Sequence, residues 1–240
     1  MSKLFLVRHG QSKWNSQNRF TGWVDVELSE QGKNEAKKSG ELLNNLNINL
    51  DFCYTSFLRR AINTLEIILK ELGKSDFKFI RAWEINERHY GSLTGLNKDE
   101  MKKKLGEELF KKYRRSWDIA PPPMENNNEN EKLYSPLNKN IDQNIIPKTE
   151  SLKDTYERVI PYFNKEIKTH LENNKNVLIA AHGNSLRALC KNLFKISDTK
   201  INELEIPTGN PLMIDFDNDL TIKNIEYLDK SREKKIITNQ

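Results

Sequence analysis

The sequence predicts an α/β fold in three layers, with a mostly parallel central sheet and helices on both of its faces. Two observations carry this prediction. Short apolar runs that suit buried strands alternate with longer segments whose apolar residues recur at helical spacing. The chain has 240 residues, enough for one domain that buries about 70% of its unfolded surface. We therefore expect a single domain over residues 1–240.

The first half of the chain predicts three strands, each followed by a helix. Ser29 is expected to cap the first of these helices, Gly73 to end the second, and Asn97 with Glu100 to cap the third. In chain order, these elements are strand 4–7, helix 29–46, strand 52–54, helix 58–72, strand 77–80 and helix 97–117.

The second half begins with three consecutive prolines at 121–123 and an asparagine-rich stretch. We expect residues 121–147 to form an irregular excursion, because no separate core follows them, and residues 230–240 to form a mobile tail. Pro161 should kink the helix that contains it. The expected elements are helix 151–171, strand 177–181, helix 185–194 and a hairpin of 212–216 with 222–228.

Composition favours a cytoplasmic protein that binds a small anion. The chain has 39 basic and 34 acidic residues, and most lysines alternate with glutamates as on a solvated helix surface. The net charge of +5 therefore does not indicate a nucleic-acid-binding protein. No apolar run approaches the roughly 20 residues of a membrane span, and no signal peptide opens the chain. Cys53 and Cys190 lack metal-ligand spacing and are expected to be reduced core thiols.

Two apolar strands end in the same pattern, His-Gly-x-Ser, beginning at His9 and at His182. If these strands are neighbours, the two imidazoles face each other at the carboxyl end of the sheet. A neutral imidazole can attack phosphorus and pass the phosphoryl group on. Gly183 and Asn184, at the start of a helix, offer backbone N–H groups to an anion.

The segment "EINERHYGSLTG" supplies a third group of polar residues. Glu87, followed by Arg88, His89 and Tyr90, is the best candidate for the carboxyl group that transfers a proton. Several arginines lie beside apolar or aromatic residues, where guanidinium groups suit phosphate or carboxylate recognition. They are Arg8, Arg60, Arg88, Arg114, Arg115 and Arg187.

Seven stretches, in order from Lys3 to about Leu228, resemble the cofactor-dependent phosphoglycerate mutases of the histidine phosphatase superfamily. They are "LVRHGQSKWN", "FTGWVDVELSEQG", "YTSFLRRAINT", "NERHYGSLTGLNK", "YRRSWDI", "AAHGNSLRAL" and "EIPTGNPL". The resemblance implies glycolytic and gluconeogenic interconversion of 3-phosphoglycerate and 2-phosphoglycerate. It also implies priming by 2,3-bisphosphoglycerate and a homodimer. No metal-ligand cluster is readable in the sequence, so we expect no metal.

The resemblance further implies roles for individual residues. His9 matches the phosphorylated histidine, Glu87 the proton donor and acceptor, and His182 the residue that stabilises the transferring group. The matches around the phosphate are Arg8, Asn15, Arg60 and Asn184. The matches that hold the carboxylate and second phosphate of the glycerate are Thr21, Gly22, Arg88, Tyr90, Lys98, Arg114 and Arg115.

Residues 124–144 depart from the family pattern, because an asparagine-rich stretch replaces the usual loop rich in proline, histidine and aspartate. This departure leaves open a phosphatase or a bisphosphoglycerate synthase that uses the same phosphohistidine chemistry. A non-enzymatic phosphate-binding module is disfavoured because His9, Glu87 and His182 are all present.

Two other enzyme classes are excluded by spacing. A serine hydrolase elbow needs glycine two residues on each side of Ser185, and Arg187 stands at one of these positions. The Gly-Lys-Ser at 73–75 lacks the first glycine of a P-loop and precedes a strand instead of following one.

Overall fold

The computed structural model of the chain describes residues 1–125 and 128–238. Residues 126–127 belong to the predicted excursion and 239–240 to the predicted tail, and both pairs lie outside the described residues. The described residues contain a six-stranded sheet in the order β3-β2-β4-β1-β5-β6. Its strands are β1 (Ser2–Arg8), β2 (Phe52–Thr55), β3 (Ile80–Arg81), β4 (Val177–Ala181), β5 (Leu212–Phe216) and β6 (Ile222–Tyr227).

The first four strands of that order run parallel, and β5 and β6 add an antiparallel hairpin to one edge. The predicted mostly parallel sheet is therefore confirmed. The pairing of β1 with β4, in the register Leu4 to Val177 through Arg8 to Ala181, has the largest consequence for function. It brings the two His-Gly-x-Ser segments together at the carboxyl ends of the two strands.

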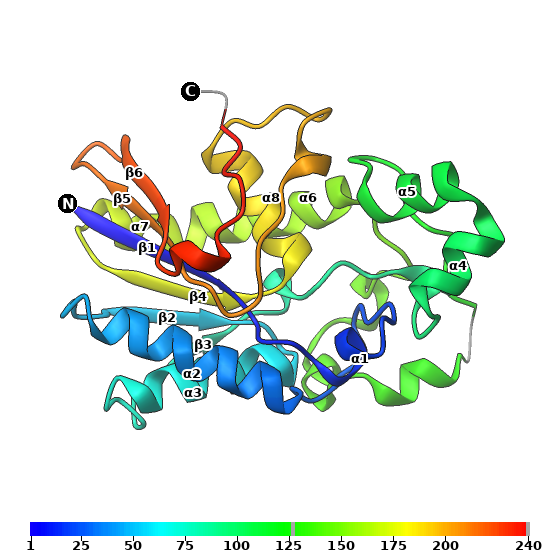
Figure 1. Cartoon of the computed structure of the whole chain (residues 1–240), viewed down its shortest axis with the longest axis horizontal. Helices are drawn as coiled ribbons and strands as arrows, with labels where there is room; N and C mark the ends of the chain where they lie inside the picture. The colour runs from blue at the N-terminus through cyan, green and yellow to red at the C-terminus, as the bar shows by residue number, and fades with distance from the viewer. Residues whose placement is uncertain (126–127, 239–240) are drawn as a thin grey trace.

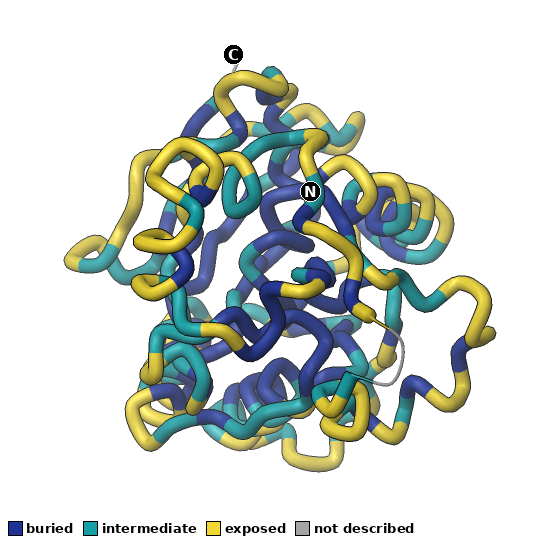
Figure 2. Tube along the Cα trace, turned by 90° about the vertical axis from the view of Figure 1, so that its right-hand side faces the viewer, coloured by how far each residue is buried: buried dark blue, intermediate teal, exposed yellow. Residues whose placement is uncertain are grey.

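Helices cover both faces of the sheet, as Figure 1 shows. α2 (Glu30–Asn44) and α3 (Arg59–Glu71) lie on one face, while α6 (Leu152–Tyr162), α7 (Lys168–Glu172) and α8 (Gly183–Leu193) lie on the other. Strand β1 supplies both cores because successive side chains point to opposite faces. Phe5 and Val7 pack with α3, whereas Leu4 and Leu6 pack with α6 and α8. Figure 2 shows the buried segments gathered inside a rim of exposed loops.

Local sequence signals account for several of the element ends. Ser29 caps α2 by accepting a hydrogen bond from Gly32 N, and Asn97 caps α4 (Lys98–Leu105) by accepting from Asp99 N and Glu100 N. Gly73 follows α3 with a φ of +68°. These caps confirm the helix starts and the stop that the sequence predicted.

The predicted helix 97–117 is two helices, α4 and α5 (Glu107–Arg115). Gly106 separates them with a φ of +79°, a conformation that glycine adopts without steric cost. The predicted helix 151–171 is also subdivided, because a π-helical turn at Phe163–Ile167 joins α6 to α7. Pro161 lies in the last turn of α6 and cannot donate the backbone hydrogen bond that a regular helix requires.

The predicted strand 77–80 is wrong in position and length. Strand β3 contains only Ile80 and Arg81, because these two residues alone pair with the end of β2. Phe77 and Phe79 produced the alternating pattern, but they pack as partly buried side chains against the α3 face. The last major helix, α8, begins at Gly183 rather than 185, so His182 is its N-cap residue.

The excursion contains three short 3₁₀ helices, Glu129–Leu133, Pro136–Asn140 and Gln143–Ile145. The other short elements are α1 (Lys13–Ser16) and the 3₁₀ helices Trp83–Ile85, Gly91–Leu93, Ile201–Glu203 and Lys230–Arg232. In the tail, Arg232 donates to the carbonyl oxygens of Thr208 and Gly209, and Ile237 is buried. Within the described ranges, none of the helices has the length and apolar character needed to cross a membrane.

Candidate active site

The two strand-end histidines lie against each other at the carboxyl edge of the parallel strands. The backbone N–H of His9 donates to Ala181 O over 2.9 Å, which extends the β1–β4 pairing by one residue. The centroids of the His9 and His182 rings are 5.0 Å apart, with an angle of 62° between the ring planes. Both side chains are buried. The expected meeting of the two imidazoles is therefore present.

Hydrogen bonds define the tautomer of His9. Its Nδ1 lies 2.7 Å from Gly10 O, so the ring proton belongs on Nδ1, where it is donated to this carbonyl. Nε2 then carries a lone pair and accepts from Nε of Arg60 over 3.3 Å. Burial, followed by the charges of Arg60 and Arg8, holds the pKa of His9 well below its ordinary value of 6.5. At neutral pH His9 is an uncharged imidazole.

Ser56 orients the His182 ring through Nε2. Ser56 Oγ lies 2.7 Å from His182 Nε2 and also accepts from Leu58 N, and because a hydroxyl can both donate and accept, this contact is satisfied by either ring tautomer. His182 Nδ1 is buried and has no side-chain hydrogen-bond partner among the described residues. Burial, followed by the charge of Arg60, also lowers the pKa of His182 well below 6.5. The second imidazole is thus a neutral donor of one N–H.

Glu87 lines the same cavity as His9, is 8% exposed, and contacts Asn184, two residues after His182. Its Oε1 accepts three hydrogen bonds, from Arg88 N (2.8 Å), Asn184 N (3.1 Å) and Asn184 Nδ2 (2.9 Å). Asn184 N is at the N-terminus of α8, where the helix dipole favours a negative charge. No hydrogen bond within the described part of the chain reaches Oε2, so this oxygen is available for proton transfer.

Arg60 supports the site from the first turn of α3, and its side chain is 1% exposed. Nη1 donates to Val24 O (2.8 Å) and Nη2 to Gly22 O (2.7 Å), while Nε faces His9. Burial lowers the pKa of Arg60 to about 10, which still leaves it positively charged at neutral pH. The positive charge is therefore fixed next to the nucleophilic nitrogen.

The histidine–glutamate cluster opens into a cavity of about 260 Å³ whose lining is strongly cationic. The basic lining residues are Arg8, Arg19, Arg60, Lys98, Arg114, Arg115, Arg187 and Lys234, whereas the acidic ones are Glu87 and Glu205. The other polar or glycine residues of the lining are His9, Asn15, Thr21, Gly22, Tyr90, Gly183 and Asn184. Such a cavity suits a small molecule with more than one anionic group.

Three residues that the sequence assigned to the site are not part of the cavity lining. His182 is fully buried behind it, in contact with His9. Arg88 is also buried, and its Nη2 donates to the carbonyl oxygens of Tyr113 and Arg114. His89 lines a second cavity instead, and its Nε2 lies 2.5 Å from Tyr134 Oη. Arg88 thus holds the end of α5, and His89 contacts the excursion.

The structure also adds four charged residues that the sequence did not assign to the site. In the sequence, Arg187 is distinguished only by its apolar surroundings, whereas Arg19, Glu205 and Lys234 carry no separate signal. Arg19 directly precedes the matched "FTGW" stretch and Glu205 lies within "EIPTG", so their neighbours were the available clue. Lys234 comes from the tail, where its sequence gave no indication of the site.

Glu205 makes an ion pair with Arg115, with 2.9 Å between Oε1 and Nη2. The carboxylate is about half exposed, whereas the guanidinium is mostly covered. Burial and the nearby Arg114 lower the pKa of Arg115, and Glu205 acts in the opposite direction. One of the predicted ligand-binding arginines therefore has an acidic partner within the cavity lining.

Comparison with known proteins gives a consistent result. The sequence matches the profile of the histidine phosphatase superfamily (branch 1) over residues 4–144 and 126–224. It is 54% identical to a 2,3-bisphosphoglycerate-dependent phosphoglycerate mutase of Pelagibacter ubique, with 99% of each chain covered. It is 48% identical to a protein of the same name from Nautilia profundicola, which covers 95% of this chain and 100% of that protein.

Solved structures agree on the fold. A mycobacterial glucosyl-3-phosphoglycerate phosphatase superposes with a TM-score of 0.71 at 21% identity, covering 94% of this chain and 96% of that one. The α-ribazole phosphatase of Shigella flexneri gives a TM-score of 0.67 at 18% identity, covering 93% and 95%. With the paired imidazoles and the full-length matches together, the chain belongs to the 2,3-bisphosphoglycerate-dependent phosphoglycerate mutase family of the histidine phosphatase superfamily.

Proposed function

We propose that this enzyme interconverts 3-phosphoglycerate and 2-phosphoglycerate through phosphorylated His9, after priming by 2,3-bisphosphoglycerate. The observation that carries the proposal is the pair of neutral imidazoles, 5.0 Å apart, beside a carboxyl group and a cationic cavity. The names of the full-length relatives support the same activity. The remaining site geometry supplies a role for each group.

His9 is the nucleophile, and Nε2 is the atom that attacks. An N–P bond forms at Nε2 while the bond between phosphorus and the leaving oxygen breaks. The low pKa of His9 keeps this lone pair unprotonated at neutral pH. Arg60 and Arg8, whose charges already depress that pKa, balance the charge of the phosphoryl oxygens.

Glu87 donates and accepts the proton of the reacting hydroxyl. Its carboxyl group protonates the leaving oxygen when His9 is phosphorylated, and the carboxylate removes a proton from the attacking hydroxyl when His9 is dephosphorylated. The three hydrogen bonds that Oε1 accepts hold the carboxyl group in place, so Oε2 is the oxygen that transfers the proton. His182, which contacts His9 from behind the cavity lining, stabilises the transferring phosphoryl group, and Ser56 orients its ring through Nε2.

The cavity fits a molecule with two phosphates and a carboxylate, because its lining is dominated by arginine and lysine. When bound, 2,3-bisphosphoglycerate supplies the phosphoryl group that primes His9. Arg8, Arg60, Asn15, Gly183 and Asn184 surround the reacting phosphate. The carboxylate and the second phosphate are bound by the remaining predicted residues, Thr21, Gly22, Tyr90, Lys98, Arg114 and Arg115.

Arg88 and His89 act indirectly in this proposal. Arg88 donates to the carbonyl of Arg114 and stacks over Tyr90, with 4.7 Å from its Cζ to the ring centroid. It therefore orients two ligand-binding side chains without contacting the ligand. His89 keeps the excursion in place through Tyr134.

The direct test is an assay with pure protein and 3-phosphoglycerate, with and without 2,3-bisphosphoglycerate. We expect 2-phosphoglycerate to appear only after priming and to exceed free phosphate. His9→Ala should abolish the activity and the acid-labile phosphoprotein while leaving the folded state intact. Free phosphate without 2-phosphoglycerate would replace the mutase proposal with a phosphatase.

We further infer a single-domain cytoplasmic enzyme that forms a homodimer and binds neither nucleic acid nor membranes. Support for the dimer comes from the sheet edge, where the two-residue strand β3 leaves Ile80 43% exposed. Light scattering during size-exclusion chromatography should give twice the chain mass of 28.1 kDa. A monomer mass at micromolar concentration would contradict this part of the proposal.

A further inference from the structure

The segment that carries Glu87 lies between two 3₁₀ helices, and residues 87–90 belong to no helix or strand. A carboxyl group on such a segment needs other contacts to keep its position. Asn184 and Arg88 N hold the carboxyl end of the side chain. The backbone of the segment is held by one residue of α6 and one residue of the loop just before α6.

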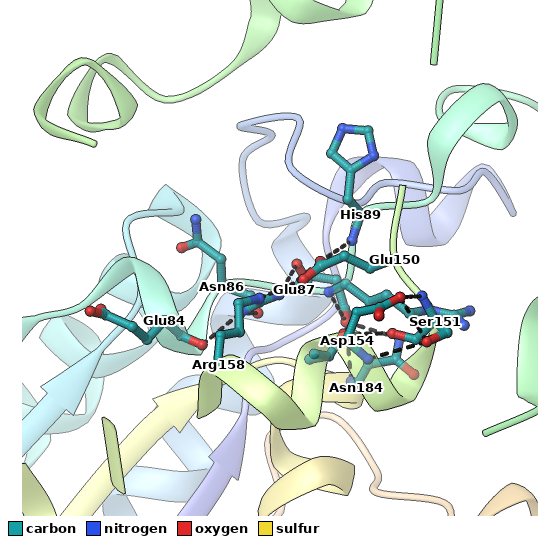
Figure 3. A network of polar contacts seen from close by, with 11 residues as sticks. Glu84, Asn86, Glu87, His89, Glu150, Ser151, Asp154, Arg158 and Asn184 are labelled. Atoms are coloured by element: carbon teal, nitrogen blue, oxygen red, sulfur yellow. Dashed lines mark hydrogen bonds and ion pairs between the residues drawn. The ribbon is translucent and has the colours of Figure 1, made fainter. Parts of the chain in front are cut away.

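Arg158 on α6 contacts three successive parts of this backbone. Its Nη1 donates to Glu84 O (2.5 Å) and Asn86 O (3.1 Å), and its Nη2 donates to Glu87 O (3.0 Å). Figure 3 shows Arg158 lying beside the segment, with Glu84 and Asn86 on one side and Glu87 near its guanidinium. One side chain thus fixes the backbone on both sides of the proton-transferring residue.

Glu150 completes the arrangement. It accepts from Nε of Arg158 (2.6 Å, Oε1) and from Nη2 (2.9 Å, Oε2), so all five N–H groups of the guanidinium are used. Glu150 Oε2 also accepts from His89 N (2.7 Å), and Glu150 N donates to His89 O (2.9 Å). The segment is therefore fastened at Glu84, Asn86, Glu87 and His89.

This pair is buried and outside the substrate cavity. The side chains of Arg158 and Glu150 are 9% and 4% exposed, and neither residue lines the cavity. The Trp23 ring covers the guanidinium, with 5.8 Å from Cζ to the ring centroid. Neither side chain can contact a molecule in the cavity, so the pair acts on Glu87 through its backbone position, while the charge of Arg158 also helps to lower the pKa of His182.

We propose that Arg158 and Glu150 are positioning residues for proton transfer, holding the Glu87 carboxyl within reach of the substrate oxygen. The inference rests on the proposed function, in which Glu87 protonates the leaving oxygen. A displacement of about 1 Å at a catalytic group can lower the rate roughly 100-fold. Lysine cannot replace Arg158, because a single ammonium group has three donors and lacks the planar fork that joins three carbonyls to a carboxylate.

The test uses Arg158→Lys and Glu150→Gln and two kinds of phosphoryl donor. The first donor is 2,3-bisphosphoglycerate, whose alkoxide leaving group needs a proton. The second is 2,4-dinitrophenyl phosphate, whose leaving group departs without one. In single-turnover phosphorylation of His9, we expect the rate with 2,3-bisphosphoglycerate to fall about 10- to 100-fold. The rate with 2,4-dinitrophenyl phosphate should fall less than about threefold.

A double-variant cycle with Glu87→Gln supplies the sharper readout. If Arg158 acts through Glu87, adding Arg158→Lys to Glu87→Gln should cause little further loss with the alkyl donor. Asp215→Asn is the matched control, since it disrupts the partly buried ion pair with Lys3 in β1, outside the cavity lining. This control should leave both rates at the level of the unmodified protein.

Equal losses with both donors, or independent losses in the double variant, would overturn the proposal, since a folding defect lowers every rate alike. If the folded fraction of Arg158→Lys is small, Glu150→Gln decides the question, because it keeps the side-chain size while it replaces one acceptor oxygen with an NH2 group that cannot accept from Arg158 or from His89 N. If the unmodified protein is not phosphorylated by the bisphosphate, the proposed function fails. The positioning inference is then decided by comparing hydrolysis of 3-phosphoglycerate with hydrolysis of the aryl ester.

Discussion

Lowering the pH should destabilise this protein before its carboxylates begin to titrate. Three buried histidines, His9, His89 and His182, have pKa values below the ordinary 6.5, and that of His89 is lowered to about 4. Burial is the largest cause for each of them. Below pH 6.5 the unfolded chain therefore binds three protons that the folded chain does not bind, and unfolding becomes more favourable.

The magnitude follows from proton linkage. For a group with an unfolded pKa of 6.5 and a much lower folded pKa, going from about pH 7.5 to about pH 5.5 increases the proton-binding polynomial of the unfolded state about tenfold. Each histidine then costs between about 1 and 2 kcal/mol, and the three together cost about 4 kcal/mol of unfolding free energy. The stabilising contribution is complete above pH 6.5 and is lost as the pH falls below it.

Urea unfolding in phosphate-free buffer at these two pH values measures the difference directly. His89→Gln is the matched variant, because His89 lies outside the substrate cavity and its removal should reduce the difference to about 3 kcal/mol. The unfolding slope should remain unchanged between the two proteins. An unfolding free energy that is the same at both pH values would refute the conclusion that these histidines are buried and neutral.

Three further substitutions test the cavity and its support. Glu205→Gln removes the ion pair of Arg115, so this arginine becomes available to the substrate. The KM for 3-phosphoglycerate should therefore fall about 2- to 5-fold in steady-state assays. A raised KM would show that the ion pair helps binding. Gly10→Ala places a Cβ 2.0 Å from Gly32 O. Thermal unfolding should therefore show that the free energy of unfolding is lower by about 3 kcal/mol. An unchanged midpoint temperature would contradict the close approach of the two backbones. Arg60→Lys removes the fork that joins two carbonyls to the nucleophile, so kcat/KM should fall about 100-fold; a change below about threefold would exclude this role.

The sequence predicted the central parts of the fold because they depend on local patterns. Apolar runs at β1 and β4 indicated buried parallel strands, and histidines directly after them had to meet once those strands paired. Caps such as Ser29 and Asn97 located helix starts because their side chains bond to backbone groups within a few residues. These features need no knowledge of distant contacts.

Other features could not be read in this way because they depend on tertiary contacts. The alternation at residues 77–80 indicated a strand, but the end of β2 allows only two paired residues there. Gly106 lies in a strongly helical sequence, and only the structure shows that its positive φ separates α4 from α5. Lys234 reaches the cavity from the tail, and Glu205 reaches it from a matched stretch whose sequence assigned this carboxylate no role. Arg88 matched a binding position, yet its buried side chain points to the end of α5.

The central location of β1 has a consequence for how the chain folds during synthesis. This strand is made first, but both of its neighbours, β4 and β5, come from residues beyond 176. Its apolar residues therefore leave the ribosome long before any native partner exists, and the two imidazoles meet only after 173 further residues have been added. Such late closure favours slow, chaperone-sensitive folding, and it makes nascent chains that stop short of β4 prone to aggregation.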